Sequence, residues 1–243
     1  MPEQKTFVAS DEAKGKAKQL RLFAVLAWVI AIAGEIFAIL KLIHNETLTW
    51  LIVAIVVILI LAVTGSMLWK KANRLDPASE KDKVKFFIQN QLGAIIGVLA
   101  FLPLVIAIFL NKDTDKKTKG IAGVVAIVAL LIAGISGIDF NPPSVEKYTQ
   151  EINQQNSVLE KLNPGDSMVY WTKAGNKYHI YQDCPHIKGR EGVTYGTVKQ
   201  SFEQRGISEL CKTCLKRAMK EKNITPEELG IKPDVLNAAD TAQ

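Results

Sequence analysis

The chain has 243 residues, of which 48% are hydrophobic and 22% are charged, and its formal net charge is +6. These averages alone leave the class of the protein ambiguous, but the distribution of the apolar residues along the chain is uneven. Nearly all the long apolar runs lie in residues 1–140, whereas residues 141–243 are polar, with 14 basic and 13 acidic side chains. The basic excess therefore belongs to the apolar half, and it does not favour a nucleic acid as the partner.

Residues 1–19 are polar and contain several lysines, and we expect them to be mobile. Four apolar runs follow, at residues 20–43, 48–69, 92–110 and 121–138. A bilayer core needs about 20 apolar residues, and a working range of about 17–25 includes all four runs. The first run also resembles a signal peptide, but it is long, lacks a small-x-small cleavage site and is followed by three more. Residues 20–140 are therefore predicted to form an all-α membrane bundle with four spans.

Lysine and arginine residues in the short loops predict the orientation of the spans. The N-terminal segment and the second loop together carry eleven of these residues, whereas the first and third loops together carry five. Since basic loops stay on the cytoplasmic side, the N- and C-termini are both predicted to lie inside. This orientation places residues 141–243 in the cytosol, although the lysine-rich third loop opposes it.

Few polar residues interrupt the predicted spans. Glu35 lies past the middle of the first span, where inserting an ionisable group costs about 2.5–3.5 kcal/mol or more. Such a residue belongs to an ion or proton pathway, contacts a partner across the bundle, or is reached by water and headgroups. Gly93 and Gly97 in the third span form a Gly-x-x-x-Gly pattern that favours close helix packing. Pro103 is expected to kink the same span.

Residues 141–162 are predicted to form a juxtamembrane amphipathic helix. Its apolar positions recur at heptad spacing and are Val145, Tyr148, Ile152, Leu159 and Leu162. Gln155 is a polar break in this apolar seam. The seam is too short for a coiled coil, and it could pack on the following domain or on a second subunit.

Residues 163–223 are predicted to fold as a small α+β domain, followed by a tail at 224–243 whose end we expect to be disordered. Two β-prone runs, at 168–171 and 177–181, flank a turn and predict a hairpin. A capping box and a glycine stop predict a later helix, and the residues concerned are Thr197, Gln200 and Gly206. A domain of about 60 residues buries little core, so a bound metal is a usual stabiliser at this size.

All three cysteines and two of the three histidines lie close together in this domain. Zinc takes four thiolate or imidazole ligands in a tetrahedron, and Cys-x-x-Cys spacing lets two sulfurs converge on one ion. Cys211 and Cys214 supply that pair, and His179 with Cys184 forms a second close pair. His186 is the alternative fourth ligand. The pattern therefore predicts a Cys3His zinc site, a type that is usually structural and closed.

Two other interpretations of the cysteines stay open. One disulfide with one free thiol would suit a domain outside the cytosol. A Cys-x-x-Cys redox pair is the second alternative, but such pairs belong near strand-helix-strand units of thioredoxin type, which the sequence does not indicate. A reducing cytosol, which the loop charges predict for this domain, suits zinc-bound thiolates.

The residues around the predicted ligands resemble a known module. This region is similar to the metal-binding N-terminal module of the bacterial Ada DNA-repair protein. The matching positions are Val169-Tyr170-Trp171, Gly175, the predicted ligand positions and Phe202. Small Ada-like zinc modules lie at the ends of many uncharacterised bacterial proteins, some of them membrane-anchored. The resemblance covers residues 167–218 and implies a zinc-binding fold in a bacterial protein. Ada has a fourth cysteine where His179 stands, and one of its cysteines is a methyl acceptor. A site with fewer thiolates leaves each sulfur less nucleophilic. The resemblance therefore implies the metal ligands here, but not the methyl-acceptor chemistry of Ada.

We expect a membrane-anchored, zinc-stabilised binding or interaction module without enzymatic activity, at the inner membrane of a bacterium. Its partners would be the lipid bilayer and either another protein or a second copy of the chain. One alternative is a transporter or channel with Glu35 at its centre, regulated by the zinc module. The other is a thiol-based sensor that uses Cys184 as a nucleophile. The sequence shows no serine-histidine-aspartate set, phosphate loop or paired-carboxylate site.

Overall fold

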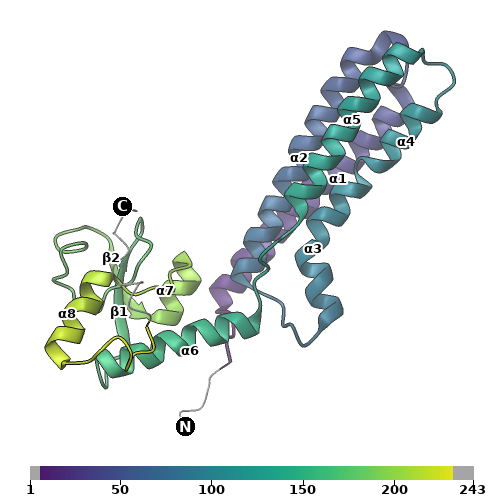
Figure 1. Ribbon diagram of the computed structural model, residues 1–243. Coiled ribbons are helices and arrows are strands. Elements are labelled where there is room, and N and C mark those ends of the chain that lie inside the picture. Colours follow the sequence, from purple (N-terminus) through teal and green to yellow (C-terminus); the bar gives the residue numbers. More distant parts are fainter. Residues whose placement is uncertain (1–5, 232–243) are drawn as a thin grey trace. The chain divides into compact units, whose positions relative to one another are not determined.

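The computed structural model describes residues 6–231, which are mostly helical. The chain divides into two compact units (Figure 1), which we call the bundle, at residues 9–145, and the module, made by the residues on either side of it. The expected mobility of residues 1–5 and the expected disorder at the end of the tail, residues 232–243, lie outside the described residues.

Five α-helices and one short 3-10 turn build the bundle, all of whose residues are described. They are α1 (Asp11–Lys41), the turn η1 (Asn45–Thr47), α2 (Leu48–Leu75), α3 (Lys83–Leu99), α4 (Leu102–Leu110) and α5 (Lys116–Gly137). Four helical segments are long and apolar enough to cross a membrane, since α3 and α4 together make the third. This result agrees with the four predicted apolar spans and suggests that the chain associates with a membrane.

The helices extend beyond the apolar runs that predict them. α1 begins at Asp11, and the Ser10 hydroxyl accepts a hydrogen bond from the N–H of Ala13, so much of the N-terminal segment expected to be mobile is helical. α2 continues to Leu75, and Lys70, which the predicted boundaries placed in a loop, is therefore a helical residue. A helix can continue past the hydrocarbon core because its backbone is bonded within the segment and its polar side chains reach the interface.

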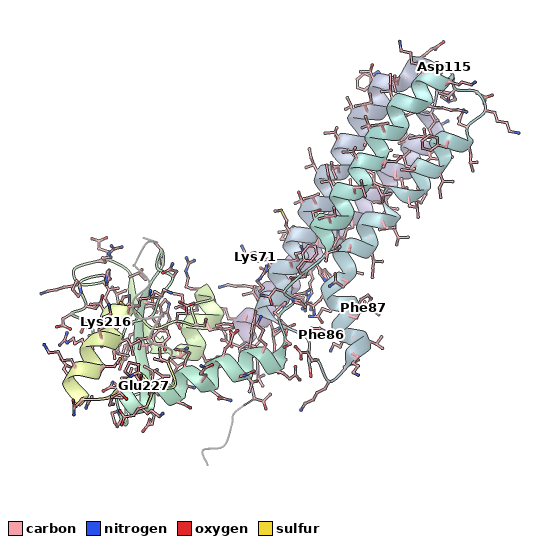
Figure 2. The ribbon with its side chains drawn as sticks, in the orientation of Figure 1. Lys71, Phe86, Phe87, Asp115, Lys216 and Glu227 are labelled. Atoms are coloured by element: carbon pink, nitrogen blue, oxygen red, sulfur yellow. The ribbon has the colours of Figure 1, made fainter. Side chains whose placement is uncertain are left out.

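Small residues fill much of the interior of the bundle, and large apolar residues cover its outside. α1 buries alanines at intervals of seven residues, namely Ala17, Ala24, Ala31 and Ala38. Its large side chains point outward instead, and Phe23 and Phe37 are each 57% exposed. Figure 2 shows the same pattern on α3, where Phe87 projects from the bundle. Lipid is as apolar as these side chains, so helices in a membrane associate through close packing of small residues, which this arrangement provides.

The predicted glycine packing is confirmed where α3 meets α5. A Cβ atom on Gly97 would lie 2.8 Å from the carbonyl oxygen of Ala133, and a Cβ atom on Gly93 would lie 3.1 Å from the carbonyl oxygen of Gly137. The first separation is too short for a carbon atom beside a backbone oxygen, and the second is tighter than most such contacts. Glycine at both positions therefore lets the two helix backbones come into contact.

The third span is broken rather than kinked. α3 ends at Leu99 and α4 begins at Leu102, with Ala100 and Phe101 between them. Pro103 explains the position of the break, because its ring clashes with the carbonyl group four residues earlier, at Leu99, and it has no N–H to bond that carbonyl. The backbone groups freed by the break need partners inside the bundle, since lipid supplies none.

In the module, the described residues form three helices and a two-stranded sheet. The elements are α6 (Val145–Leu162), β1 (Met168–Thr172), β2 (Val193–Thr197), α7 (Val198–Arg205) and α8 (Lys212–Lys222). α6 contributes Leu159 and Leu162 to a core that also contains Trp171 and Tyr178. The predicted amphipathic helix thus packs within its own module. Its polar break has a partner there, since the Tyr178 hydroxyl donates to Oε1 of Gln155 at 2.6 Å.

The predicted hairpin is only partly right. β1 pairs in antiparallel register with β2, with Tyr170 opposite Tyr195, and β2 was not among the predicted strands. The second predicted strand is reduced to a bridge, in which Tyr170 and His179 exchange both backbone hydrogen bonds at 2.7 Å. The capping box at Thr197 and the left-handed glycine stop at Gly206 are confirmed, and they delimit α7.

The segment before α1 packs within the module. Phe7 is 5% exposed, and its ring makes edge contacts with the rings of Tyr148 on α6 and Phe202 on α7. The backbone N–H of Phe7 also donates to the hydroxyl of Thr149 at 2.8 Å. A single aromatic side chain therefore anchors a segment whose polar composition alone predicts mobility.

Candidate metal centre

Four side chains of the module form one cluster. The ligand atoms of His179, Cys184, Cys211 and Cys214 all lie within 4.8 Å of one another, and all four residues are buried. These are the four residues that the ligand spacing in the sequence predicts. A buried group of three thiols and one imidazole could bind a metal ion.

Two distances inside the cluster are close to those around a tetrahedral ion. Sγ of Cys184 lies 4.0 Å from Sγ of Cys211, and Sγ of Cys214 lies 3.7 Å from Nδ1 of His179. Bonds of about 2.3 Å to sulfur and about 2.0–2.1 Å to nitrogen place the ligand atoms of tetrahedral zinc roughly 3.5–3.8 Å apart. The observed separations need only small side-chain adjustments to reach that geometry.

Backbone hydrogen bonds hold two of the ligand segments side by side. His179 lies on the extended segment that is bridged to β1. The preceding residue, Tyr178, accepts a hydrogen bond from the N–H of Cys211 at 2.8 Å and donates its own N–H to Glu209 at 2.9 Å. Cys214 follows in the first turn of α8. A long-range pairing between extended segments therefore brings the histidine to the Cys-x-x-Cys pair.

A tight turn presents the remaining ligand, Cys184. Its N–H donates to the carbonyl oxygen of Tyr181 at 3.2 Å, and its carbonyl oxygen accepts from the N–H groups of Ile187 and Lys188 at 2.9 and 2.8 Å. These bonds fix the backbone on both sides of the sulfur. The side chain is 2% exposed, so the turn directs it into the module rather than toward solvent.

Backbone N–H groups point at all three sulfur atoms. The donors are His186 for Cys184, Cys214 for Cys211, and both Tyr181 and Ile180 for Cys214. Each of these bonds favours the anionic form of the sulfur that accepts it. The loops are thus arranged to stabilise the negative charge that thiolate ligands carry when a metal binds.

Hydrogen bonds within the cluster also distinguish the three thiols. The pKa of Cys211 is lowered to about 3, because the Cys214 thiol donates to its sulfur and the His179 ring donates to it as well. The bond to Cys211, followed by burial, raises the pKa of Cys214, and burial raises the pKa of Cys184. Metal ligands must be deprotonated, so a cation that binds these sulfurs competes with their protons.

The predicted alternative ligand, His186, lies next to the cluster but outside it. Its ring centroid is 6.3 Å from that of His179, and its Nε2 atom is 3.0 Å from the hydroxyl oxygen of Thr213. The residue is exposed, whereas His179 is buried. The structure therefore groups His179, and not His186, with the three cysteines. All three cysteines, which are described, are free rather than paired in a disulfide.

A surface cluster that the sequence analysis missed ties two ligand segments together. Arg217 of α8 donates to both carboxylate oxygens of Asp183 at 2.8 and 2.9 Å, and its Nε donates to Glu221 at 2.9 Å. Its guanidinium carbon also lies 4.1 Å from the ring centroid of Tyr181. Asp183 directly precedes one ligand, and Arg217 lies one helical turn after another. Only the i,i+4 spacing of Arg217 and Glu221 could have indicated part of this cluster from the sequence.

The remaining candidate residue, Glu35, belongs to the bundle and not to the metal cluster. It is 3% exposed, and its Oε1 atom accepts a hydrogen bond from the backbone N–H of Leu104 at 3.2 Å. Leu104 lies in the first turn of α4. The side chain singled out in the first span therefore contacts the break in the third span.

Comparisons of this chain with protein-family models, with curated proteins and with solved structures found no match. What the protein does is therefore inferred from its own residues and their geometry.

Proposed function

We propose that the chain is a bacterial inner-membrane protein whose module is stabilised by structural zinc and serves as a non-enzymatic binding unit. The observation that carries this proposal is the buried cluster of three thiols and one imidazole, with its ligand atoms within 4.8 Å of one another. Zinc is the metal that such a ligand set usually holds in a small domain. Four protein ligands complete a tetrahedron and leave no position for water or substrate, so the metal would act on folding rather than on chemistry.

The proposed orientation places both termini and the module in the cytosol. Phe7 packs against Tyr148 and Phe202 within the module, which supports placing the segment before the first span and the domain after the last on one side of the membrane. An even number of spans has the same consequence. The loop charges select the cytoplasmic side, and a reducing compartment keeps thiolate ligands available for zinc. The bacterial assignment rests on the motif resemblance to Ada-like modules.

The partner of the module is proposed to be a protein or a second copy of the chain. The part of the chain after the spans carries nearly balanced charge, which does not favour a polyanion. The burial of Cys184 does not favour a thiol-based sensor, because a nucleophilic sulfur needs access to its reactant. A binding unit tethered beside the bilayer requires neither an open metal position nor an accessible thiol.

Metal content of the full-length chain, purified in detergent and measured by inductively coupled plasma mass spectrometry, tests the proposal. We expect about one zinc per chain in the parent, as a single Cys3His site requires. Cys214→Ser and His179→Ala should each lose most of the metal. His186→Ala is the matched control and should keep it, because this ring lies outside the cluster. A metal-free parent with a disulfide between two of the cysteines would contradict structural zinc and would favour an oxidising compartment instead.

A further inference from the structure

We propose that Glu35 caps the broken third span from inside the bundle and holds α3 and α4 as two separate helices. This inference concerns the bundle and does not depend on the metal centre. It assigns to Glu35 a positioning role, in place of the ion-pathway role that a lone acidic residue in a span suggests.

The break creates a need for a hydrogen-bond acceptor within the membrane. The first N–H groups of any helix lack partners inside that helix. Phe101, at the N-cap of α4, has no side chain that can cap these groups, and Pro103 has no N–H at all. The N–H of Leu104 therefore needs an outside acceptor, and Oε1 of Glu35 supplies it at 3.2 Å.

The surroundings of the break prevent water or lipid from taking over this task. Ala100, Phe101 and Leu104 are fully buried in the core of the bundle, together with the α1 residues on either side of Glu35, Ala31 and Ala38. Lipid has no hydrogen-bonding groups at this depth. A side chain from a neighbouring helix is then the partner that remains, and α1 provides one.

The chemistry of a carboxylate matches this position. The N-terminal end of a helix carries a partial positive charge, which favours a negative group beside it. The same partial charge disfavours a cation, so the side chain and the helix end form a complementary pair rather than a cation site. An amide oxygen could accept the same hydrogen bond, whereas an aliphatic side chain could not.

The role proposed for Glu35 depends on the helix break at Pro103. Glu35 is needed because Pro103 breaks the helix and frees the N–H of Leu104. If Pro103 is replaced by alanine, the helix can continue and the N–H of Leu104 can bond to the carbonyl oxygen of Ala100. Removing the carboxylate should then matter in the parent background and not in the Pro103→Ala background, which a double-mutant cycle measures.

Hydrogen-deuterium exchange of the full-length chain in lipid nanodiscs, read by mass spectrometry on peptides covering residues 100–106, tests this dependence. We expect Glu35→Leu to accelerate exchange in these peptides by about tenfold, as loss of a helix cap does. Glu35→Gln should stay within about twofold of the parent, because its amide oxygen still accepts. Glu35→Leu combined with Pro103→Ala should return to the parent rate. Phe37→Leu, a substitution on the exposed face of α1, is the matched control and should have no effect.

Three results would each overturn the proposal. Glu35→Leu could leave exchange unchanged, which would show that the carboxylate does not protect α4. Glu35→Gln could be as damaging as Glu35→Leu, which would show that a hydrogen-bond acceptor at this position does not suffice to protect α4. The double variant could behave like Glu35→Leu alone, which would separate the residue from the break. If Glu35→Leu does not fold, recovery of folded protein in the double variant supports the proposal, and failure to recover it overturns the proposal.

Discussion

The bundle and the module differ in the side chains at their internal contacts and on their surfaces. The bundle buries many alanines and glycines beside larger residues such as Ile55 and Phe101, and its outer surface is large and apolar, whereas the module buries Trp171, Tyr178 and Leu159. Water drives large apolar side chains inward, but lipid offers no such driving force and leaves close contact between backbones as a main attraction. The bundle should therefore be sensitive to added volume, and the small module to loss of its proposed metal.

The two units also place their buried polar groups differently. In the module, four ligand atoms gather in one cluster that a single cation can neutralise. In the bundle, buried and half-buried polar groups are spread over several helices, and two of them contact helix ends. Glu35 lies at the start of α4, and Lys70 donates to the carbonyl oxygens of Ser136 and Ile138 at the end of α5, at 2.8 and 2.6 Å. A carboxylate at a helix start and an ammonium group at a helix end both complement the helix dipole.

Metal removal is expected to have the largest effect, and the effect should be confined to the module. Structural zinc binding contributes about 10–16 kcal/mol to zinc-finger peptides at pH 7, whereas the core of a domain this small contributes only about 3–5 kcal/mol. A strong zinc chelator should therefore unfold the module and leave the spans helical. Limited proteolysis of the full-length chain in detergent should then give new cleavage sites in residues 146–231 and none within α1, α2 or α5.

Substitution of a ligand provides the matching comparison without chelator. Cys214→Ser should reproduce the cleavage pattern of the chelated parent, whereas His186→Ala should remain resistant, as its ring is outside the cluster. A module that stays resistant after its metal has been stripped would show that its apolar core suffices. The proposed difference between the two units would then disappear.

A single methyl group should damage the bundle by the next largest amount. At Gly137 an added Cβ would overlap backbone atoms of Gly93 and Ala94, so Gly137→Ala must push α3 and α5 apart. Overpacking of this kind costs about 1–3 kcal/mol. The measurement is the midpoint of unfolding on titration with sodium dodecyl sulfate in mixed micelles, followed by circular dichroism. The zinc content of the module should not change.

Gly134 is the matched control on the same helix. An added Cβ there meets nothing within 4 Å, and alanine is the better helix former by roughly 0.5–1 kcal/mol. Gly134→Ala should therefore leave the midpoint unchanged or raise it slightly. Equal loss of stability in both variants would mean that the loss at Gly137 does not arise from contact between the two backbones.

The sequence predicted best those features that depend on composition or on short spacing. Run length indicated the four apolar helices, and Pro103 indicated the interruption in the third. The capping box at Thr197 predicted the start of α7 because both partners lie within one turn. The metal ligands were predicted from two pairs of residues that are close in the sequence. In the structure, backbone hydrogen bonds of Tyr178 with Glu209 and Cys211 bring these two pairs together.

The features that the sequence did not reveal depend on residues far apart in the chain. The strand that pairs with β1 lies at Val193–Thr197, and the nearer β-prone run was predicted instead because hairpin patterns consider only neighbouring strands. The contact of Arg217 with Asp183 joins segments 34 residues apart. The partner of Glu35 is a backbone N–H, which no residue pattern indicates.

Loss of the Phe7 ring is expected to have the most local effect, and it would show how far the module depends on packing as well as on its proposed metal centre. The ring makes two edge contacts, and such aromatic pairs contribute about 0.5–1.5 kcal/mol each in addition to the burial of the ring. Phe7→Ala should therefore release the segment before α1, and Val8→Ala should not, because Val8 is 57% exposed. Limited proteolysis of the metal-loaded chain should show new cleavage before Asp11 only. Cleavage that spreads into residues 146–231 would instead show that the fold of the module needs the Phe7 ring. Packing as well as the proposed metal would then stabilise the module, as packing stabilises the bundle.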